Sequence, residues 1–258
     1  MKRLRFLFLA FLGAFLVLAQ ACQQDNPDPA KEETNTVKAP VGFTGFKHGE
    51  WTYMIRTAEK DTPAAKSALE LLEKNLDEID GLLPASALKV MHEHPIWLEK
   101  DLTDGAAWYH NNKDYLISQG YMLEKWRCVE LCNYVHYVSW VKQNQPYMVL
   151  HELCHLYHDL ALPGGFENSD VKNAYKKAME SGKYVNTAYR LDKNTVIEHY
   201  DDYYHAKVYA TTNCMEYFSE ICEAYWGEND YYPFNYEDLK SYDPDGFALM
   251  EKVWGKRQ

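Results

Sequence analysis

The feature that most constrains this chain is the run His151-Glu152-Leu153-Cys154-His155, which has the pattern H-E-x-x-H. On a helix, residues four apart lie on one face, so His151 and His155 can bind one metal ion. Glu152 is rotated by about 100° from His151, which lets its carboxylate face a water molecule instead of the metal. The pattern therefore predicts a metal site, provided that this segment is helical.

The flanking residues predict that helix. Gln145-Pro146 supplies a start, because proline is tolerated in a first turn, and Pro163-Gly164-Gly165 supplies a stop. The apolar residues between them are too widely spread for a freely solvated helix: Val149, Leu150, Leu153, Leu156, Tyr157 and Leu160. We expect a largely buried helix, in which an unpartnered His-Glu-His set would be costly. The alternative is an incidental match whose histidines are ordinary core residues.

Two histidines and a glutamate at this spacing are typical of zinc peptidases, in which the metal lowers the pKa of its water to about 7 and the glutamate takes the proton. A catalytic zinc ion normally has a third protein ligand. The metzincin continuation is excluded, because His158 and Ala161 stand where its glycine and last histidine belong. Glu216 and Glu220 offer another solution, since they share one face of a predicted helix. One carboxylate would bind zinc and the other would hydrogen-bond a ligand histidine.

The H-E-x-x-H motif is followed by a second motif, Y-x-x-T-N-x-x-E-Y-F-x-E, over residues 209–220. In this order the two motifs resemble the catalytic domain of anthrax lethal factor and related gluzincin-type zinc peptidases. Most of the folded chain is also similar to a group of uncharacterised bacterial metallopeptidases. The resemblance implies zinc ligands His151, His155 and Glu216, general base Glu152, an orienting role for Glu220, and Tyr209 as hydrogen-bond donor to the tetrahedral intermediate.

The segment between the two motifs is rich in tyrosine and leaves other third ligands open. Rival candidates in it are His199, Asp201, Asp202 and His205. We expect Glu216 to bind the metal and His158, one turn beyond His155, to be a surface or core residue. Tyr184 to Tyr204 is expected to be irregular.

The N-terminal residues 1–21 have the features of a signal peptide: Lys2, Arg3 and Arg5 precede an apolar run. The run ends at Leu18-Ala19-Gln20-Ala21-Cys22, which resembles a bacterial lipobox with Cys22 as the lipidated residue. Residues 22–42 are then a lipid-anchored, disordered tether, and the partner of this end is a membrane. The alternative is plain secretion after Ala21; both predict an exported protein.

The net charge, the cysteine count and the motifs that are missing exclude several classes of function. A net charge of −11 argues against nucleic acid as a partner. The chain has six cysteines, and setting Cys22 aside leaves five, so at least one thiol is unpaired. Cys154, inside the motif helix, is expected to be a small buried apolar residue. Phosphate-binding loops, nucleophile elbows and dinucleotide motifs do not occur, so nucleotide use and serine hydrolysis have no support.

Residues 43–258 predict an α+β, zincin-like domain with a small mixed sheet, the H-E-x-x-H helix and a mainly helical C-terminal half. The expected elements before that helix are a strand at 51–56, a helix from Pro63 to Gly81, strands at 88–91 and 96–99, a hairpin of 107–110 with 115–118, and a strand or mixed segment at 129–138. After it we expect a helix capped by Ser169 and stopped by Gly182, the helix of the second motif, and a short helix ending near Trp254.

The sequence thus predicts an exported zinc metallopeptidase acting on a peptide or protein. Two alternatives stay open. One is a lipid-anchored binding protein that keeps the zincin fold without turnover, and the other is a zinc amidase acting on cell-wall peptides.

Overall fold

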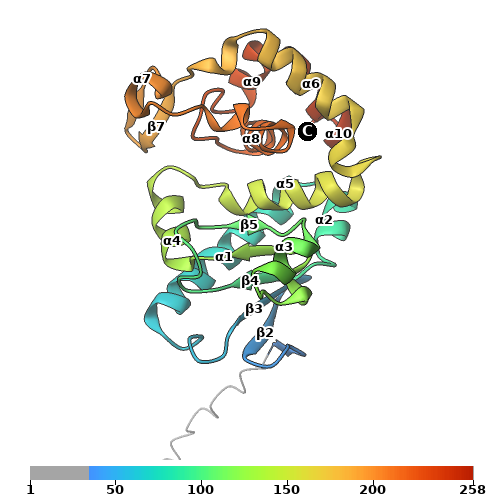
Figure 1. Ribbon diagram of the computed structural model, residues 1–258, viewed down its shortest axis with the longest axis vertical. Helices are drawn as coiled ribbons and strands as arrows, with labels where there is room; N and C mark the ends of the chain where they lie inside the picture. The colour runs from blue at the N-terminus through green and yellow to red at the C-terminus, as the bar shows by residue number, and fades with distance from the viewer. Residues whose placement is uncertain (1–34, 258) are drawn as a thin grey trace, which may run out of the picture. The chain divides into compact units, whose positions relative to one another are not determined.

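The computed structural model describes residues 35–257, which belong to one unit beginning at Asn35. The predicted signal peptide, Cys22 and the tether as far as residue 34 lie outside the described residues. The fold is α+β: a mixed sheet with its helices comes first, and a mainly helical half follows (Figure 1). Within residues 35–257, no helix combines the length and the apolar character needed to cross a bilayer.

The main sheet has six strands in the order β1-β2-β3-β4-β6-β5. The pairs β1/β2, β2/β3 and β6/β5 are antiparallel, and β3/β4 and β4/β6 are parallel. Its strands are β1 (Thr36–Val37), β2 (Phe43–His48), β3 (Trp51–Arg56), β4 (Ile96–Leu98), β5 (Trp108–Tyr109) and β6 (Val129–Leu131). The strands predicted at 51–56 and 96–99 are thereby confirmed, and β5 is an edge strand.

The disordered tether was predicted to extend to residue 42, but the structure shows a strand at Thr36–Val37. Thr36 and Val37 pair with Phe46 and Gly45 of β2, so ordered structure starts before Phe43. Polar composition suggested a disordered segment, but β2 offers a free sheet edge whose backbone groups β1 satisfies. A Cβ at Gly45 would lie only 2.8 Å from the side chain of Val37, so this pairing depends on glycine at position 45.

Helix α1 (Pro63–Leu82) begins as predicted, because the Thr62 side chain accepts a hydrogen bond from the Ala65 amide at 3.2 Å. Its buried face includes Leu72, Leu76 and Ile79, which belong to the same core cluster as the buried residues of β3. The strand predicted at 88–91 is wrong, since Ala85–Met91 forms helix α2. The buried residues of α2 are Ala87 and Met91, which are four residues apart, a helical spacing. The predicted strand covered only residues 88–91, so this spacing was not recognised.

The hairpin predicted from 107–110 and 115–118 is also wrong. Trp108–Tyr109 is strand β5, but its partner is β6, and Lys113–Ser118 is helix α3. Asn112 caps α3, with its side chain accepting from the Tyr115 amide at 3.0 Å. The asparagines thus start a helix instead of closing a turn.

The mixed segment at 129–138 divides into β6 and helix α4 (Tyr134–Gln143). Helix α5 (Met148–Ala161) follows and carries the H-E-x-x-H motif, as predicted. It lies between the sheet half and the C-terminal half, and contacts α1, α2, β5 and β6 on one side and α8 on the other (Figure 1). Cys154 is fully buried in it, and all five cysteines of the described residues are free thiols.

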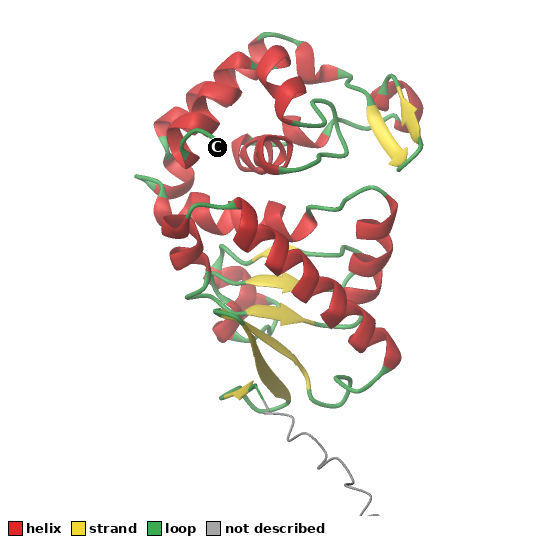
Figure 2. Cartoon of the chain, turned by 180° about the vertical axis from the view of Figure 1, so that it is seen from behind, coloured by secondary structure: helices red, strands yellow, loops and turns green. Residues whose placement is uncertain are grey.

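The C-terminal half is mainly helical and contains one small hairpin (Figure 2). Its elements are α6 (Ser169–Glu180), β7 (Tyr189–Asp192), β8 (Thr195–Ile197), α7 (Tyr200–Tyr204), α8 (Cys214–Trp226), α9 (Tyr236–Tyr242) and α10 (Pro244–Trp254). Asn168, rather than Ser169, caps α6. The region predicted to be irregular contains β7, β8 and α7, and α9 was not predicted. In α10, Phe247, Met250 and Trp254 are buried, as their spacing indicated.

Candidate metal centre

Helices α5 and α8 pack against each other and bring the two sequence motifs together. Asn213 caps α8, accepting hydrogen bonds from the amides of Met215 at 2.8 Å and Glu216 at 3.0 Å. This cap fixes Glu216 in the first turn of α8. At the other end, the ring of Tyr147, just before α5, covers Gly227, where a Cβ would lie 2.1 Å from a ring atom. The start of α5 therefore lies beside the end of α8.

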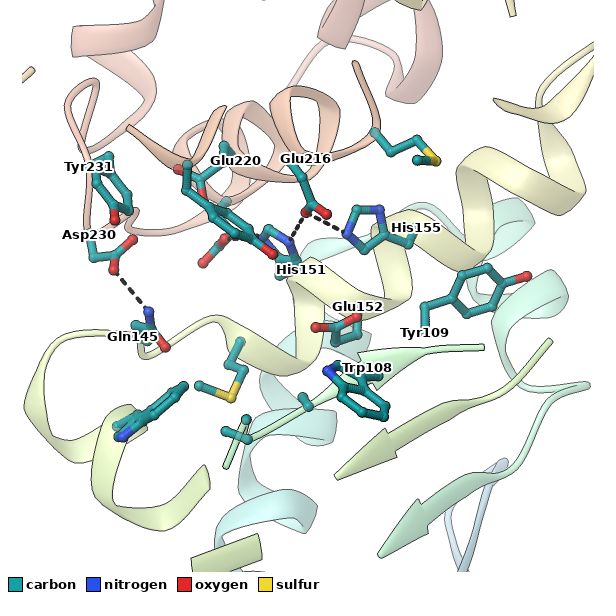
Figure 3. Close-up of a pocket in the computed structure, with 18 of the residues that line it drawn as sticks. Trp108, Tyr109, Gln145, His151, Glu152, His155, Glu216, Glu220, Asp230 and Tyr231 are labelled. Atoms are coloured by element: carbon teal, nitrogen blue, oxygen red, sulfur yellow. Dashed lines mark hydrogen bonds and ion pairs between the residues drawn. The ribbon is translucent and has the colours of Figure 1, made fainter. Parts of the chain in front are cut away.

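Three side chains converge between these helices. Nε2 of His151 and Nε2 of His155 lie 3.1 Å and 3.0 Å from Oε2 of Glu216 (Figure 3). All three ligand atoms lie within 4.8 Å of one another. Both histidines are buried, and Glu216 is half-buried. The structure thus groups the three residues that the sequence predicted as metal ligands.

The other ring nitrogens of the two histidines also have partners on α8. Nδ1 of His151 lies 2.7 Å from Oε1 of Glu223, and Nδ1 of His155 lies 3.1 Å from Oγ of Ser219. We expected Glu220 to make such a contact, but its nearest oxygen is 4.0 Å from Nδ1 of His151, too far for a hydrogen bond. Glu220 instead accepts a hydrogen bond from Nδ2 of Asn229 at 3.0 Å.

Sequence reasoning missed Glu223 and Ser219. The available signal was their spacing on α8. Residues 216, 219, 220 and 223 recur at intervals of three and four, so their side chains lie on the one face of the helix that meets α5. Glu223, two turns from Glu216, was as well placed for a histidine contact as Glu220. Which of the two reaches a histidine depends on the axial offset between α5 and α8, which the sequence does not state.

The charges in this group are strongly coupled. Burial alone would lower the pKa of His151, but its hydrogen bonds to Glu216 and Glu223 outweigh burial and raise that pKa well above its ordinary value. Burial acts to raise the pKa of Glu216, yet the two histidines hold it far below its ordinary value. Burial raises the pKa of Glu223 to about 7, against the lowering effect of His151. Positive charge between the three ligand atoms is therefore stabilised.

The donor set fits a zinc ion. Without a metal, the raised pKa of His151 places a proton on Nε2, toward the oxygen of Glu216. Metal binding would replace that proton, and an ionised Glu223 would hold the remaining proton on Nδ1. Two lone pairs at this distance attract only when a proton or cation lies between them. Imidazole nitrogen and carboxylate oxygen are both common zinc ligands, and on a tetrahedral ion they lie about 3.4 Å apart. The observed separations of 3.1 Å and 3.0 Å are close to that value.

A cavity of about 380 Å³ opens beside the three ligand atoms. Glu152 lines it, lying between the two histidines and Trp108 of β5 (Figure 3). Burial raises the pKa of the Glu152 carboxyl above its ordinary value, although the histidines act to lower it. No other described side chain or backbone group hydrogen-bonds this carboxylate, which leaves it free to act on a molecule in the cavity.

Tyr209 borders the same cavity from a short 3-10 turn, Tyr209–Thr211, just before α8. Its ring centroid lies 5.9 Å from that of His151, and 43% of the residue is exposed. The phenol makes no hydrogen bond to any of the described residues, and burial raises its pKa. It is thus a protonated donor at physiological pH, without an internal acceptor.

The rival ligands lie elsewhere. His199, Asp201, Asp202 and His205 are exposed residues of α7 and its two flanks, and none of them lines the cavity. His158 is fully buried between the rings of Phe166 and Phe218 and lines no part of the cavity. Among the described residues, the third donor beside the two motif histidines is therefore Glu216.

Comparisons of the chain with protein-family models, with curated proteins and with solved structures found no match.

Proposed function

We propose that this protein is a zinc-dependent metallopeptidase with a zincin-like fold. The observation that carries the proposal is the convergence of His151, His155 and Glu216 on one point at the wall of a cavity, with an unpaired carboxylate, Glu152, beside it. Core histidines of an incidental motif would pair with unrelated polar groups. Here both Nε2 atoms face the same carboxylate oxygen.

When bound, zinc supplies a Lewis acid and a water of lowered pKa. The residues of the chain supply the rest. Glu152, unpaired and at the cavity wall, takes a proton from the attacking water and passes it to the leaving amine. Tyr209 lines the cavity, and its phenol donates a hydrogen bond to the oxyanion that forms at the attacked carbonyl.

The shape of the site supports a peptide as substrate. The cavity is bordered by edge strand β5 on one side and by α8 on the other, so an extended chain can enter from the solvent. Aromatic side chains line its walls, including Trp108, Trp140, Phe166 and Tyr231. Peptide hydrolysis, rather than cleavage of another amide, follows the resemblance between the two motifs and the gluzincin-type peptidases.

The test is the zinc content of the purified protein, measured by elemental analysis in the wild type and in His155→Ala and Glu216→Ala. We expect near-stoichiometric zinc in the wild type and its loss or depletion in both variants. A peptide library then identifies the bonds that the wild type cleaves. A wild type without zinc would overturn the proposal, and a zinc-loaded wild type that cleaves no peptide would favour a binding protein that keeps the fold.

A further inference from the structure

The contacts behind the two motif histidines follow a matched spacing. His151 and His155 are four residues apart on α5, and their partners Glu223 and Ser219 are four residues apart on α8. The order is reversed, because the earlier histidine meets the later residue of α8. Two antiparallel helices in contact give this pattern when one turn of each is in register with one turn of the other. The register thus supplies an oxygen to Nδ1 of each histidine.

Glu223 and Glu220 are both buried glutamates of α8, but they differ in their distance from His151. Glu223 lies 2.7 Å from Nδ1 of His151, whereas the nearest oxygen of Glu220 is 4.0 Å away. Glu220 is engaged by Asn229, and the neighbouring Asp230 by Gln145 at 3.0 Å. Only Glu223, of these three buried carboxylates, has its closest contact with a motif histidine.

The contact determines which nitrogen of His151 is available to a metal. A carboxylate accepts and does not donate, so it holds the proton of a neutral imidazole on Nδ1. The lone pair is then on Nε2, which faces Oε2 of Glu216. A charged acceptor also increases the basicity of the ring, which strengthens a bond from Nε2 to a cation. Ser219 contacts Nδ1 of His155 at 3.1 Å through a neutral hydroxyl, which can donate or accept and therefore orients the ring without fixing its tautomer.

We propose that Glu223 is a positioning residue of the metal centre, which fixes the tautomer and the ring orientation of His151 and so raises the affinity for zinc, with Ser219 in the lesser role of orienting the ring of His155. This inference rests on the proposed zinc site. It assigns to Glu223 the role that the motif pattern gave to Glu220.

The experiment measures zinc affinity by competition with a chromophoric chelator in the intact protein. Loss of such a supporting residue reduces metal affinity by about 10- to 100-fold. We expect about 100-fold weaker binding in Glu223→Leu and about 10-fold in Glu223→Gln, whose amide oxygen still accepts from Nδ1. Ser219→Ala should weaken binding by less than about 10-fold. The matched comparison is Glu220→Gln, at the same burial and on the same helix, with a change below about threefold.

A second measurement separates positioning from general stability. Thermal unfolding of the zinc-free variants should show comparable changes in Glu223→Gln and Glu220→Gln, because each substitution removes one charge from the same group of buried carboxylates. Nitrogen-15 NMR of the zinc-bound wild type should show the His151 proton on Nδ1.

The outcomes distinguish this inference from the proposed function. If the wild type binds zinc and all three variants, Glu223→Gln, Glu223→Leu and Glu220→Gln, bind it with the same affinity, Glu223 has no positioning role. The proposed zinc site would still stand. A larger loss in Glu220→Gln than in Glu223→Gln would return the role to Glu220. No zinc binding by the wild type would overturn both proposals.

Discussion

Two groups of buried carboxylates lie on opposite sides of helix α5, and they differ in how their charge is balanced. On the sheet side, Lys125 donates to Glu99 at 2.8 Å and also to Glu130. Arg56 donates to Glu99 at 2.7 Å, and His110 lies 2.6 Å from Glu130. We call Glu99, Glu130 and these partners the sheet cluster. Each of its carboxylates has a cationic partner within the protein, so its negative charge is balanced.

On the other side, Glu216, Glu220, Glu223 and Asp230 form the α8 cluster. Among residues 35–257, no lysine or arginine forms an ion pair with any of them, and their side-chain partners are histidines and amides. Buried charge is costly unless it is paired or binds a metal. The comparison teaches that the lysine and arginine side chains of this protein balance the sheet cluster but not the α8 cluster, which is the difference expected if the α8 cluster binds the proposed zinc ion.

The largest expected effect tests the catalytic side of this contrast. Replacing Glu152 with Gln removes the proton acceptor but leaves the three ligand side chains in place. Peptide cleavage should fall by about 10²- to 10⁴-fold, with unchanged zinc content by elemental analysis. Glu124→Gln, at an exposed position, serves as control. Normal cleavage by Glu152→Gln would rule out the assigned role.

The next largest effect concerns the stability that Lys125 gives to the sheet cluster. Lys125→Met leaves Glu99 and Glu130 without their shared cation, which should cost about 3–5 kcal/mol of unfolding free energy. Urea unfolding measures the loss, and zinc content per folded molecule should not change. Exposed Lys66→Met should alter stability by no more than about 0.5 kcal/mol. A small loss in Lys125→Met would show that Arg56 and His110 balance the two carboxylates without Lys125.

A somewhat smaller effect is expected at Tyr209. Tyr209→Phe keeps the ring beside His151 and removes the phenol donor. Loss of one donor to an oxyanion lowers kcat by about 10²- to 10³-fold, while KM and zinc affinity should change little. Steady-state kinetics measure both constants, with Tyr203→Phe, on exposed α7, as the matched control. A rise in KM with constant kcat would mean that Tyr209 only binds substrate.

The smallest effect is the acid response of the sheet cluster. Burial acts to raise the pKa of Glu130, but His110 and Lys125 outweigh it and hold the pKa below 4.5, its ordinary value. A carboxyl with a depressed folded-state pKa contributes stability above its ordinary pKa, and this contribution is lost as the pH falls through the folded-state value.

Urea midpoints measured from pH 6 downward should therefore decrease below about pH 4.5 in the wild type. Glu130→Gln, which cannot titrate, should show a shallower decrease, although its stability at neutral pH is lower. Equal slopes in the two proteins would show that other carboxyls carry the acid response. Cys132 and Tyr121 also lie near Glu130, and both remain neutral in this range.

The elements that were predicted correctly are those with strong local signals. Helix α1 has a threonine cap and apolar residues at helical spacing over several turns, and α5 lies between proline and glycine signals. The errors at Ala85–Met91 and Lys113–Ser118 fall on short helices with few turns, for which periodicity carries little information. At Asn112 the local signal was also ambiguous, because asparagine caps a helix as readily as it starts a turn.

The sequence by itself determined the chemistry available to this protein: two histidines and a glutamate on one helix, and a second helix with carboxylates on one face. Helical periodicity placed His151 with His155 on one face and Glu216 with Glu220 on another, and the resemblance of the two motifs to gluzincin-type peptidases pointed to Glu216 as the third ligand. Only the tertiary structure decided that Glu223, not Glu220, meets His151, and that Lys125 pairs with the sheet cluster while no lysine or arginine of the described residues pairs with the α8 cluster. Such choices depend on the offset between packed elements, which long-range contacts fix and local sequence does not encode.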